Sequence, residues 1–442
     1  MYQIKIMNKR ILKLALPNIL TNLTVPLLGM VDLHLMGYLD SAVYMGAIAL
    51  GGVIFNLVYW GFAFLRMSIS GIAAQSYGKD DSFDIANTLF RGLLLALSGA
   101  LLLLILQTGI EKISFLILDG SPEVKALASD YFYVRIWAAP AAISLMVFYG
   151  WFLGMQNAIY PMIIAVSVNI VNILLSYLFV RTFGMNVDGV ALGSVIAQYF
   201  GLFLAVVFFL KKYRYILKTF NLSAIIDGKG IRNFLNVSGD IFIRTACIIL
   251  VFTFFTSESA GFGNITLAAN SALLQFLFLF SYFLDGFAYA AEALVGKYFG
   301  AKDTINLKKV IRLLMLWGLG FGILFSLLYL LFGDELLLFF TKHENVLREG
   351  RNYLPWLVLM PILSFASYIW DGVYIGTTAS KLMKYTMIAS TIVFFTIYYS
   401  FNSRLQNNAL WLAIIVFSFM RSFLQFIFYK RAVLLKNNNI AN

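Results

Sequence analysis

The chain is predicted to be an all-α membrane protein that crosses the bilayer many times. Of its 442 residues, 61% are hydrophobic and only 12% are charged, whereas soluble domains carry about 25% charged residues. The mean hydropathy is +0.84, and the apolar residues form long runs between short polar breaks. About 20 apolar residues in a helix cross a bilayer, so each run is a predicted transmembrane helix.

The runs predict twelve helices in two sets of six. The first set lies near residues 11–37, 46–74, 85–110, 126–150, 158–181 and 188–210. The second set lies near residues 232–257, 266–296, 305–332, 349–372, 381–402 and 408–430. The longest polar connection separates the two sets. We therefore expect an N-terminal six-helix lobe at 1–210, a cytoplasmic linker at 211–231 and a C-terminal six-helix lobe at 232–442.

The two sets resemble each other at one constant offset in residue number, which we name the repeat offset. It places Gly78 on Gly300, Asp81 on Asp303, Gly150 on Gly372, and Gly154 on Gly376. Pro140 and Pro361 correspond within one residue. Each half has an even number of spans, so both halves enter the membrane from the same side and form parallel repeats. Two pseudo-symmetric lobes around a central cleft are a common transporter architecture.

The distribution of basic residues predicts how the chain is oriented in the membrane. Lys and Arg gather at the N-terminus, in the central loop, in the loop after the eighth helix and in the C-terminal tail. With twelve spans all four segments fall on one side, and the positive-inside rule makes that side the cytoplasm. The net charge of +12 is therefore a feature of membrane topology and indicates no nucleic-acid partner. The first apolar run is too long for a signal-peptide core, so we expect no cleavable signal.

The rare residue types exclude several kinds of site. Cys247 is the single cysteine, which rules out an internal disulfide and a cysteine-based metal site. His34 and His343 are the two histidines, too few for a His-cluster metal site. We expect no metal and no organic cofactor.

Asp32 is the first candidate functional residue, because it lies inside the first apolar run. A carboxylate within a membrane span is costly and marks a functional site by default, although a structural acid in its protonated form can also cap a freed carbonyl. Pro26 lies six residues before it and removes a backbone donor, which weakens the helix there. An acid beside such a point indicates a site in which ion occupancy is coupled to a bend in the first helix.

Polar residues on the fifth predicted helix could complete such a site or stabilise helix packing. Asn172 and Ser176 lie one turn apart in the fifth helix and can face the same side. They could hydrogen-bond Asp32, or they could make ordinary interhelical contacts.

Charged residues in the seventh and eighth predicted helices could bind substrate or could have a structural role. Asp240 and Arg244 lie four apart, a spacing that permits an intrahelical salt bridge. Asp285 and Glu292 lie seven apart on one face, with Tyr289 between them. Asp285 could attract a cationic substrate, whereas Glu292 is expected to reach water near the cytoplasmic end.

Several segments resemble the multidrug and toxic compound extrusion (MATE) transporters. LPNILTNLTVPLLGMVDLHLMGYL resembles the family's first helix, and MNVDGVALGSVIAQY resembles the sixth helix of its DinF-like branch. GDIFIR, FLDGFAYAAEALVGKYFGAKD and DGVYIGTTAS resemble parts of the seventh, eighth and tenth helices. The matches follow the family order from Leu16 to Ser380. The resemblance implies an ion-coupled exporter, or antiporter, of amphipathic and often cationic compounds in the cell membrane.

The resemblance also implies a coupling site, from which this chain departs. The family combines the first-helix Asp with an Asn and a second Asp on helix five and a Thr on helix six. Here Asn172 matches, but Ser176 replaces the second Asp and Ser194 replaces the Thr. A sodium ion prefers several oxygen ligands with compensating charge, whereas a proton needs one acid with an adjustable pKa. We therefore expect proton rather than sodium coupling through Asp32.

Two other functions are weaker alternatives. A flippase of lipid-linked saccharides would need a strongly basic cavity for pyrophosphate, but the membrane charges are mostly acidic, with Arg66, Arg135 and Arg244 scattered among them. A membrane-embedded enzyme would need clustered catalytic groups, which the sequence does not show. The expected partners are an amphipathic small molecule and the lipid bilayer, and the protein is expected to be a monomer.

Overall fold

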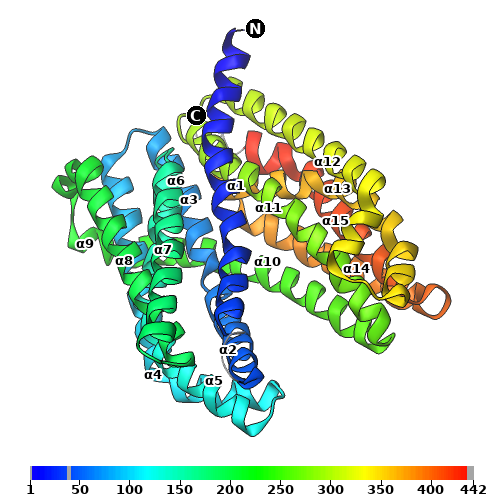
Figure 1. The fold of residues 1–442 in the computed structure, drawn as a ribbon. Coiled ribbons are helices and arrows are strands. Elements are labelled where there is room, and N and C mark those ends of the chain that lie inside the picture. The colour runs from blue at the N-terminus through cyan, green and yellow to red at the C-terminus, as the bar shows by residue number, and fades with distance from the viewer. Residues whose placement is uncertain (1, 37–40, 436–442) are drawn as a thin grey trace. The chain divides into compact units, whose positions relative to one another are not determined.

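The computed structural model describes residues 2–36 and 41–435, with backbone alone at residues 25, 27–36, 42, 229, 434 and 435. Every regular element in this part of the chain is helical (Figure 1). In the first half these are α1 (Tyr2–Met36), α2 (Ala42–Trp60), α3 (Ala63–Gly78), α4 (Ser82–Ile117), α5 (Pro122–Arg135), η1 (Ile136–Ala138), α6 (Ala139–Gly154), α7 (Ile159–Tyr177), η2 (Leu178–Thr182), α8 (Val187–Tyr213), η3 (Arg214–Thr219) and α9 (Leu222–Ile225). In the second half they are α10 (Gly228–Gly261), α11 (Asn264–Gly300), α12 (Thr304–Phe340), α13 (Glu344–Gly376), α14 (Ser380–Leu405), α15 (Asn407–Tyr429) and η4 (Lys430–Leu435).

The predicted set of membrane-spanning helices is confirmed. Eleven stretches of the described residues are long and apolar enough to cross a membrane. The helix α1 covers the remaining predicted span as far as Met36. One crossing is interrupted at Gly61 between α2 and α3, and another contains the short turn η1 between α5 and α6. The polar breaks in the sequence therefore placed the helices correctly, while interruptions within a crossing come from local backbone geometry.

The chain forms two compact units. One contains Leu20–Phe234, and the other contains Met1–Ile19 together with Leu235–Asn442. In the first unit α3 packs on α4 and α6, α2 packs on α5, and α8 packs on α5, α6 and α7. In the second unit α11 and α12 pack on α13, and α14 packs on α15 (Figure 1). Each unit therefore buries the apolar faces of its own helices.

The predicted internal repeat is confirmed in the turns that join the helices. Asp81 is the N-cap of α4 and accepts a hydrogen bond of 3.0 Å from the Asp84 backbone nitrogen. Asp303 is the N-cap of α12 and accepts an equal bond of 3.0 Å from the Asn306 nitrogen. Asp80 and Lys302, directly before these caps, share a φ of 58°. Both pairs are related by the repeat offset, so the same turn is built twice.

Close helix packing repeats in the same way. A Cβ added to Gly150 on α6 would collide with the backbone carbonyl of Arg66 on α3. A Cβ added to Gly372 on α13 would collide with the carbonyl of Ala288 on α11. The repeat offset relates both the two glycines and the two carbonyls. Glycine is needed at these two positions because any side chain would push the paired helices apart.

Candidate functional site

The first buried polar cluster lies in the unit Leu20–Phe234, where α8 packs against both α5 and α7. Asn172 on α7 and Ser194 on α8 are both buried. The Asn172 Nδ2 atom donates a hydrogen bond of 2.8 Å to Ser194 Oγ. The half-buried Arg135, at the end of α5, donates through Nη1 to the same oxygen at 2.7 Å. We name Arg135, Tyr131, Asn172, Ser176 and Ser194 the Ser194 cluster.

Local backbone features bring these side chains together. The helix α5 ends at Arg135, and a short 3-10 turn leads into α6, which has Pro140 in its first turn. Proline cannot donate a backbone hydrogen bond, so it favours the start of a new helix at this point. On α8, Gly193 leaves room for α7, because a Cβ there would lie 2.9 Å from Ser176 Oγ. The helices can therefore approach closely at Ser194.

Aromatic rings hold the Arg135 guanidinium. Its Nη1 atom also donates to the Tyr131 hydroxyl at 2.7 Å. The guanidinium carbon lies 5.3 Å from the centre of the Phe55 ring and 5.4 Å from that of Tyr131. Cation–π contacts of this kind stabilise by about 0.5–2 kcal/mol. From the sequence, Arg135 had no role beyond that of one of three scattered arginines, whereas helix packing places it on Ser194, one of the predicted ion-coupling residues.

The Ser194 cluster contains buried polar atoms that could hydrogen-bond a further group. Asn172 Oδ1 and Ser176 Oγ are buried and have no hydrogen-bond partner within the described residues. Ser194 Oγ already accepts two hydrogen bonds, so its own hydrogen is directed to a third group. An uncommitted donor and two uncommitted oxygens are costly when buried. They match a group that can both donate and accept hydrogen bonds.

The sequence-predicted residues of the first helix are only partly described. The side chain of Asp32 lies outside the described residues, although its backbone is part of α1. The helix continues through Pro26 to Met36, and the proposed bend at Pro26 stays a prediction. Asn169 Nδ2, on α7, donates to the Thr24 carbonyl of α1 at 3.5 Å. This contact places the first helix beside the helix that carries Asn172 and Ser176.

A second polar cluster, in the other unit, is centred on Asp371 of α13. Arg421 on α15 donates to Asp371 Oδ2 at 2.7 Å, and Arg244 on α10 binds the same oxygen. Gln425 Nε2 donates to Asp371 Oδ1 at 2.8 Å. Asp371 and Arg421 are buried. We name Asp371, Arg244, Arg421 and Gln425 the Asp371 network. These residues come from three helices. The sequence showed charged residues within apolar runs, but it gave no sign that they would meet.

The expected salt bridge between Asp240 and Arg244 was wrong. Asp240 instead pairs with Lys384 of α14 at 2.5 Å and accepts a hydrogen bond of 2.9 Å from Ser380 Oγ. Arg244 pairs with Asp371. A pair at this helical spacing stabilises by only about 0.2–0.5 kcal/mol. Partners from neighbouring helices form ion pairs with both charges instead, so tertiary contacts decide the pairing.

The acidic residues of α11 lie at different depths. Asp285 is half-buried and interacts electrostatically with Tyr368 of α13, as do Arg421 and Asp371. Arg244 also interacts with Tyr368, so the acids and bases around this tyrosine are balanced in formal charge.

Glu292 is buried, so the expectation that it reaches water was wrong. The close approach of Gly376 on α13 to the Glu292 carbonyl explains this, because a Cβ there would lie 2.8 Å from that oxygen. Tyr289 is half-buried on the same helix.

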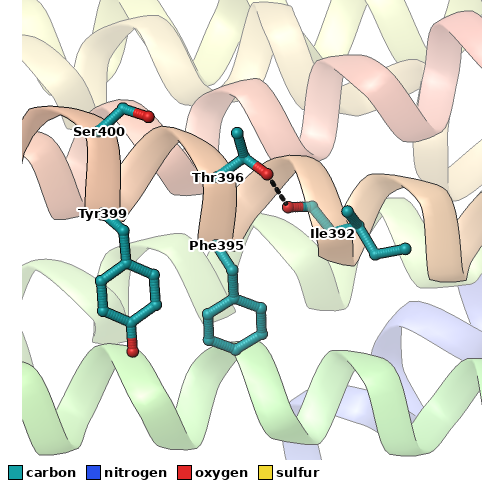
Figure 2. A pocket seen from close by; sticks show the side chains of 5 residues that line it. All are labelled: Ile392, Phe395, Thr396, Tyr399 and Ser400. Carbon is teal, nitrogen blue, oxygen red and sulfur yellow. Dashed lines mark hydrogen bonds between the residues drawn. The ribbon is translucent and has the colours of Figure 1, made fainter.

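A surface hollow on α14 is no candidate site. Ile392, Phe395, Thr396, Tyr399 and Ser400 line it, and all five belong to this one helix (Figure 2). Figure 2 also shows that Thr396 donates back to the Ile392 carbonyl, at 2.8 Å. Ile392 and Tyr399 are exposed. Exposed apolar side chains on a membrane helix are expected to face lipid, so the hollow adds nothing to function. Among the described residues, no group of three His, Cys, Asp or Glu side chains could hold a metal ion.

Comparison with known proteins decides the family. Residues 17–178 and 241–399 match the MatE family. The chain belongs to the MatE family. It is 36% identical over 418 residues to the DNA damage-inducible protein F of Escherichia coli strain K12, a match that covers 94% of this chain and 90% of that protein. The resemblance to the DinF-like branch is confirmed. The multidrug and toxin extrusion protein 1 of Homo sapiens is 26% identical over 385 residues, covering 85% of this chain and 65% of that protein.

Solved structures confirm the MatE fold. A MATE crystal structure in the bent conformation matches with a TM-score of 0.89 at 17% identity, covering 99% of this chain and 97% of that chain. The MATE transporter VcmN of Vibrio cholerae, in its bent form, matches with a TM-score of 0.87 at 17% identity and 99% coverage of both chains. This MatE protein is therefore a multi-pass membrane transporter and not an enzyme.

Proposed function

We propose that this MatE protein is an antiporter that exports amphipathic, often cationic, small molecules in exchange for protons. The observation that carries the proposal is the Ser194 cluster, a buried set of polar groups inside a transporter unit with uncommitted oxygens at Asn172 and Ser176. The extrusion of drugs and toxins named for the human relative supports the substrate class. The balanced charges around Asp371 do not favour a flippase, which would need a basic cavity.

The internal repeat supports placing Asp32 at this cluster. The repeat offset relates positions 32, 172 and 176 to Phe254, Phe394 and Tyr398. Phe254 packs edge to face on both partners, with ring centroids 5.9 Å from Phe394 and 5.1 Å from Tyr398. A repeat that preserves this packing brings Asp32 beside Asn172 and Ser176. The second half fills the same positions with aromatic rings, so the proposed ion site belongs to the first half alone.

The proposed chemistry is a proton cycle at Asp32. A protonated carboxyl donates one hydrogen bond and accepts others. It would donate to Asn172 Oδ1 and accept from Ser176 or Ser194, which completes the unfinished hydrogen bonds of the cluster. Once the proton leaves, the carboxylate accepts only, and the contact with Asn172 Oδ1 is lost. This exchange changes the packing of α1, and Pro26 provides the point at which the helix would bend.

The remaining proposals concern the setting of this transport. The basic loops favour a cell membrane location with both termini in the cytoplasm. Transport would draw on an ion gradient, without an organic cofactor, in a monomer. Asp285, Tyr289 and Glu292 are proposed as substrate or structural polar sites, together with Asp240 and Arg244. Of the two acids on α11, Asp285 is better suited to attract a cationic substrate, since it is half-buried whereas Glu292 is buried.

The test is efflux of a cationic fluorescent dye from liposomes that contain the purified protein. One set of liposomes carries a pH gradient in sodium-free buffer, and the other carries a sodium gradient at equal pH. The proposal expects efflux in the first set and background leak in the second. Efflux that follows sodium and ignores the pH gradient would contradict proton coupling, and no efflux in either set would contradict export of this substrate class.

A further inference from the structure

The Arg135 guanidinium is a fixed positive charge within the proposed ion site. It is bound to Ser194 Oγ, which is bound in turn to Asn172. We propose that Arg135 determines the ion specificity of the Ser194 cluster, by placing a permanent cation where a sodium ion would otherwise be held. This inference rests on the proposed ion-coupled export, and it names the residue that selects the proton.

Competition for oxygen ligands is the first argument. Sodium is bound by oxygen lone pairs, as hard cations are in general. A serine hydroxyl has two lone pairs, and both lone pairs of Ser194 Oγ are taken by the hydrogens of Arg135 and Asn172. The position where the family carries a Thr oxygen therefore presents a hydrogen to the site. Asn172 Oδ1 and Ser176 Oγ are the buried oxygens of the cluster that stay uncommitted.

Charge is the second argument. Like charges at short range in a low-dielectric interior repel strongly. Two phenols lie beside Arg135, Tyr131 on α5 and Tyr59 on α2. Neutral phenols do not offset the charge of Arg135. One carboxylate at Asp32 would balance Arg135 without leaving net negative charge for a sodium ion, whereas a proton binds to the carboxylate covalently and adds a donor.

Contacts with neighbouring side chains fix the position of the Arg135 guanidinium. Its guanidinium lies over the Phe55 and Tyr131 rings and donates to the Tyr131 hydroxyl. Three contacts from two helices, two cation–π contacts and one hydrogen bond, therefore keep it in place. In the repeat, position 135 corresponds to Leu357, so the second half has no equivalent charge. The cation is a property of the proposed ion site and not of the shared helical framework.

The test uses the full-length protein in detergent and in liposomes. The variant Arg135→Gln removes the charge but keeps a polar side chain, and Arg135→Lys keeps the charge. Arg181→Gln, at an exposed arginine on η2, is the matched control. The first measurement is the unfolding temperature in sodium chloride compared with choline chloride at equal ionic strength and pH. The second is dye efflux under separate pH and sodium gradients.

We expect sodium to stabilise Arg135→Gln by roughly 3 °C when present well above its dissociation constant. Wild type, Arg135→Lys and Arg181→Gln should shift by less than about 1 °C, since each keeps the charge at position 135. Efflux by Arg135→Gln should gain a dependence on the sodium gradient. A folded Arg135→Gln protein that ignores sodium in both measurements overturns the inference.

Wild-type protein provides an outcome that needs no variant. Sodium-dependent stabilisation of the wild type, or wild-type efflux driven by sodium, overturns the role of Arg135 even where Arg135→Gln fails to fold. Sodium stabilisation of Arg135→Lys would overturn it as well. Absence of wild-type dye efflux under both gradients defeats the proposed export instead, while the unfolding temperatures still decide whether Arg135 excludes sodium.

Discussion

Arg421 of α15 donates to Asp371 of α13 at 2.7 Å, and the pair is buried within one unit of the protein. The same carboxylate binds Arg244 of α10. One acid therefore joins three helices, and its second oxygen is held by Gln425 at 2.8 Å. A buried charge pair costs desolvation, but removing one partner leaves the other uncompensated. The Asp371 network should therefore stabilise the packing of these three helices.

Replacing Asp371 with Asn should strongly destabilise the protein, because the buried Arg421 and the half-buried Arg244 lose their shared carboxylate. We expect a loss of about 3–5 kcal/mol, measured by thermal unfolding in detergent. Asp334→Asn is the matched control, since Asp334 forms a half-exposed pair with Arg351 at 2.9 Å. Its cost should stay within about 1 kcal/mol. Equal stability of the two variants would refute the role of Asp371.

Asp240 and Lys384 should be energetically coupled. Either single neutral variant, Asp240→Asn or Lys384→Met, leaves one charge without its partner, whereas the double variant removes both charges. A double-mutant cycle should give a coupling energy of roughly 1–3 kcal/mol. The exposed pair of Asp334 and Arg351 should give less than about 1 kcal/mol in the same experiment. Additive losses at Asp240 and Lys384 would show that the pair contributes nothing specific.

Gly150→Ala should destabilise the protein because the new Cβ collides with the backbone carbonyl of Arg66. Overpacking of this kind costs about 1–3 kcal/mol. Gly52→Ala in α2 is the control, since no atom beyond its chain neighbours and its own helix backbone lies within 4 Å of its added Cβ. That change should be neutral or stabilising by up to about 1 kcal/mol through helix propensity. Thermal unfolding of both variants tests the contrast, and a tolerated Gly150→Ala contradicts it.

Asp32→Asn should abolish dye efflux driven by a pH gradient while the protein stays folded. The amide cannot take up and release a proton, so the proposed cycle stops. Efflux from liposomes measures the effect, with size-exclusion chromatography to check folding and Asp334→Asn as the matched control. Wild-type rates in Asp32→Asn at equal protein content would remove Asp32 from the mechanism.

Asn172→Ala should slow proton-driven efflux by about tenfold, which corresponds to about 1.4 kcal/mol. The change removes the hydrogen bond to Ser194 and the uncommitted Oδ1 proposed to accept from Asp32. Asn169→Ala is the control on the same helix, because its described contact is a long hydrogen bond to the Thr24 carbonyl. Equal rates in the two variants would argue that Asn172 serves packing alone.

Hydrophobic runs, turn residues and spacing determined much of this protein without a structure. The apolar runs located the membrane-spanning helices, because crossing lipid requires about 20 apolar residues whatever the neighbours are. The repeat offset was visible in the sequence, because Asp81 and Asp303 cap helices locally and Gly150 and Gly372 meet a carbonyl in the same way. These features depend on local backbone geometry or on a close contact that only glycine permits.

Only the tertiary structure decided which polar groups meet. Asp240 and Arg244 are neighbours on α10 but bind Lys384 and Asp371 on other helices. Arg135 lies far from Ser194 along the chain, yet packing of α5 on α8 places its guanidinium 2.7 Å from that hydroxyl. Sequence periodicity specifies the face and depth of a side chain on its own helix. Its partner depends on how neighbouring helices are rotated and how closely they approach, and that is decided by packing throughout the bundle.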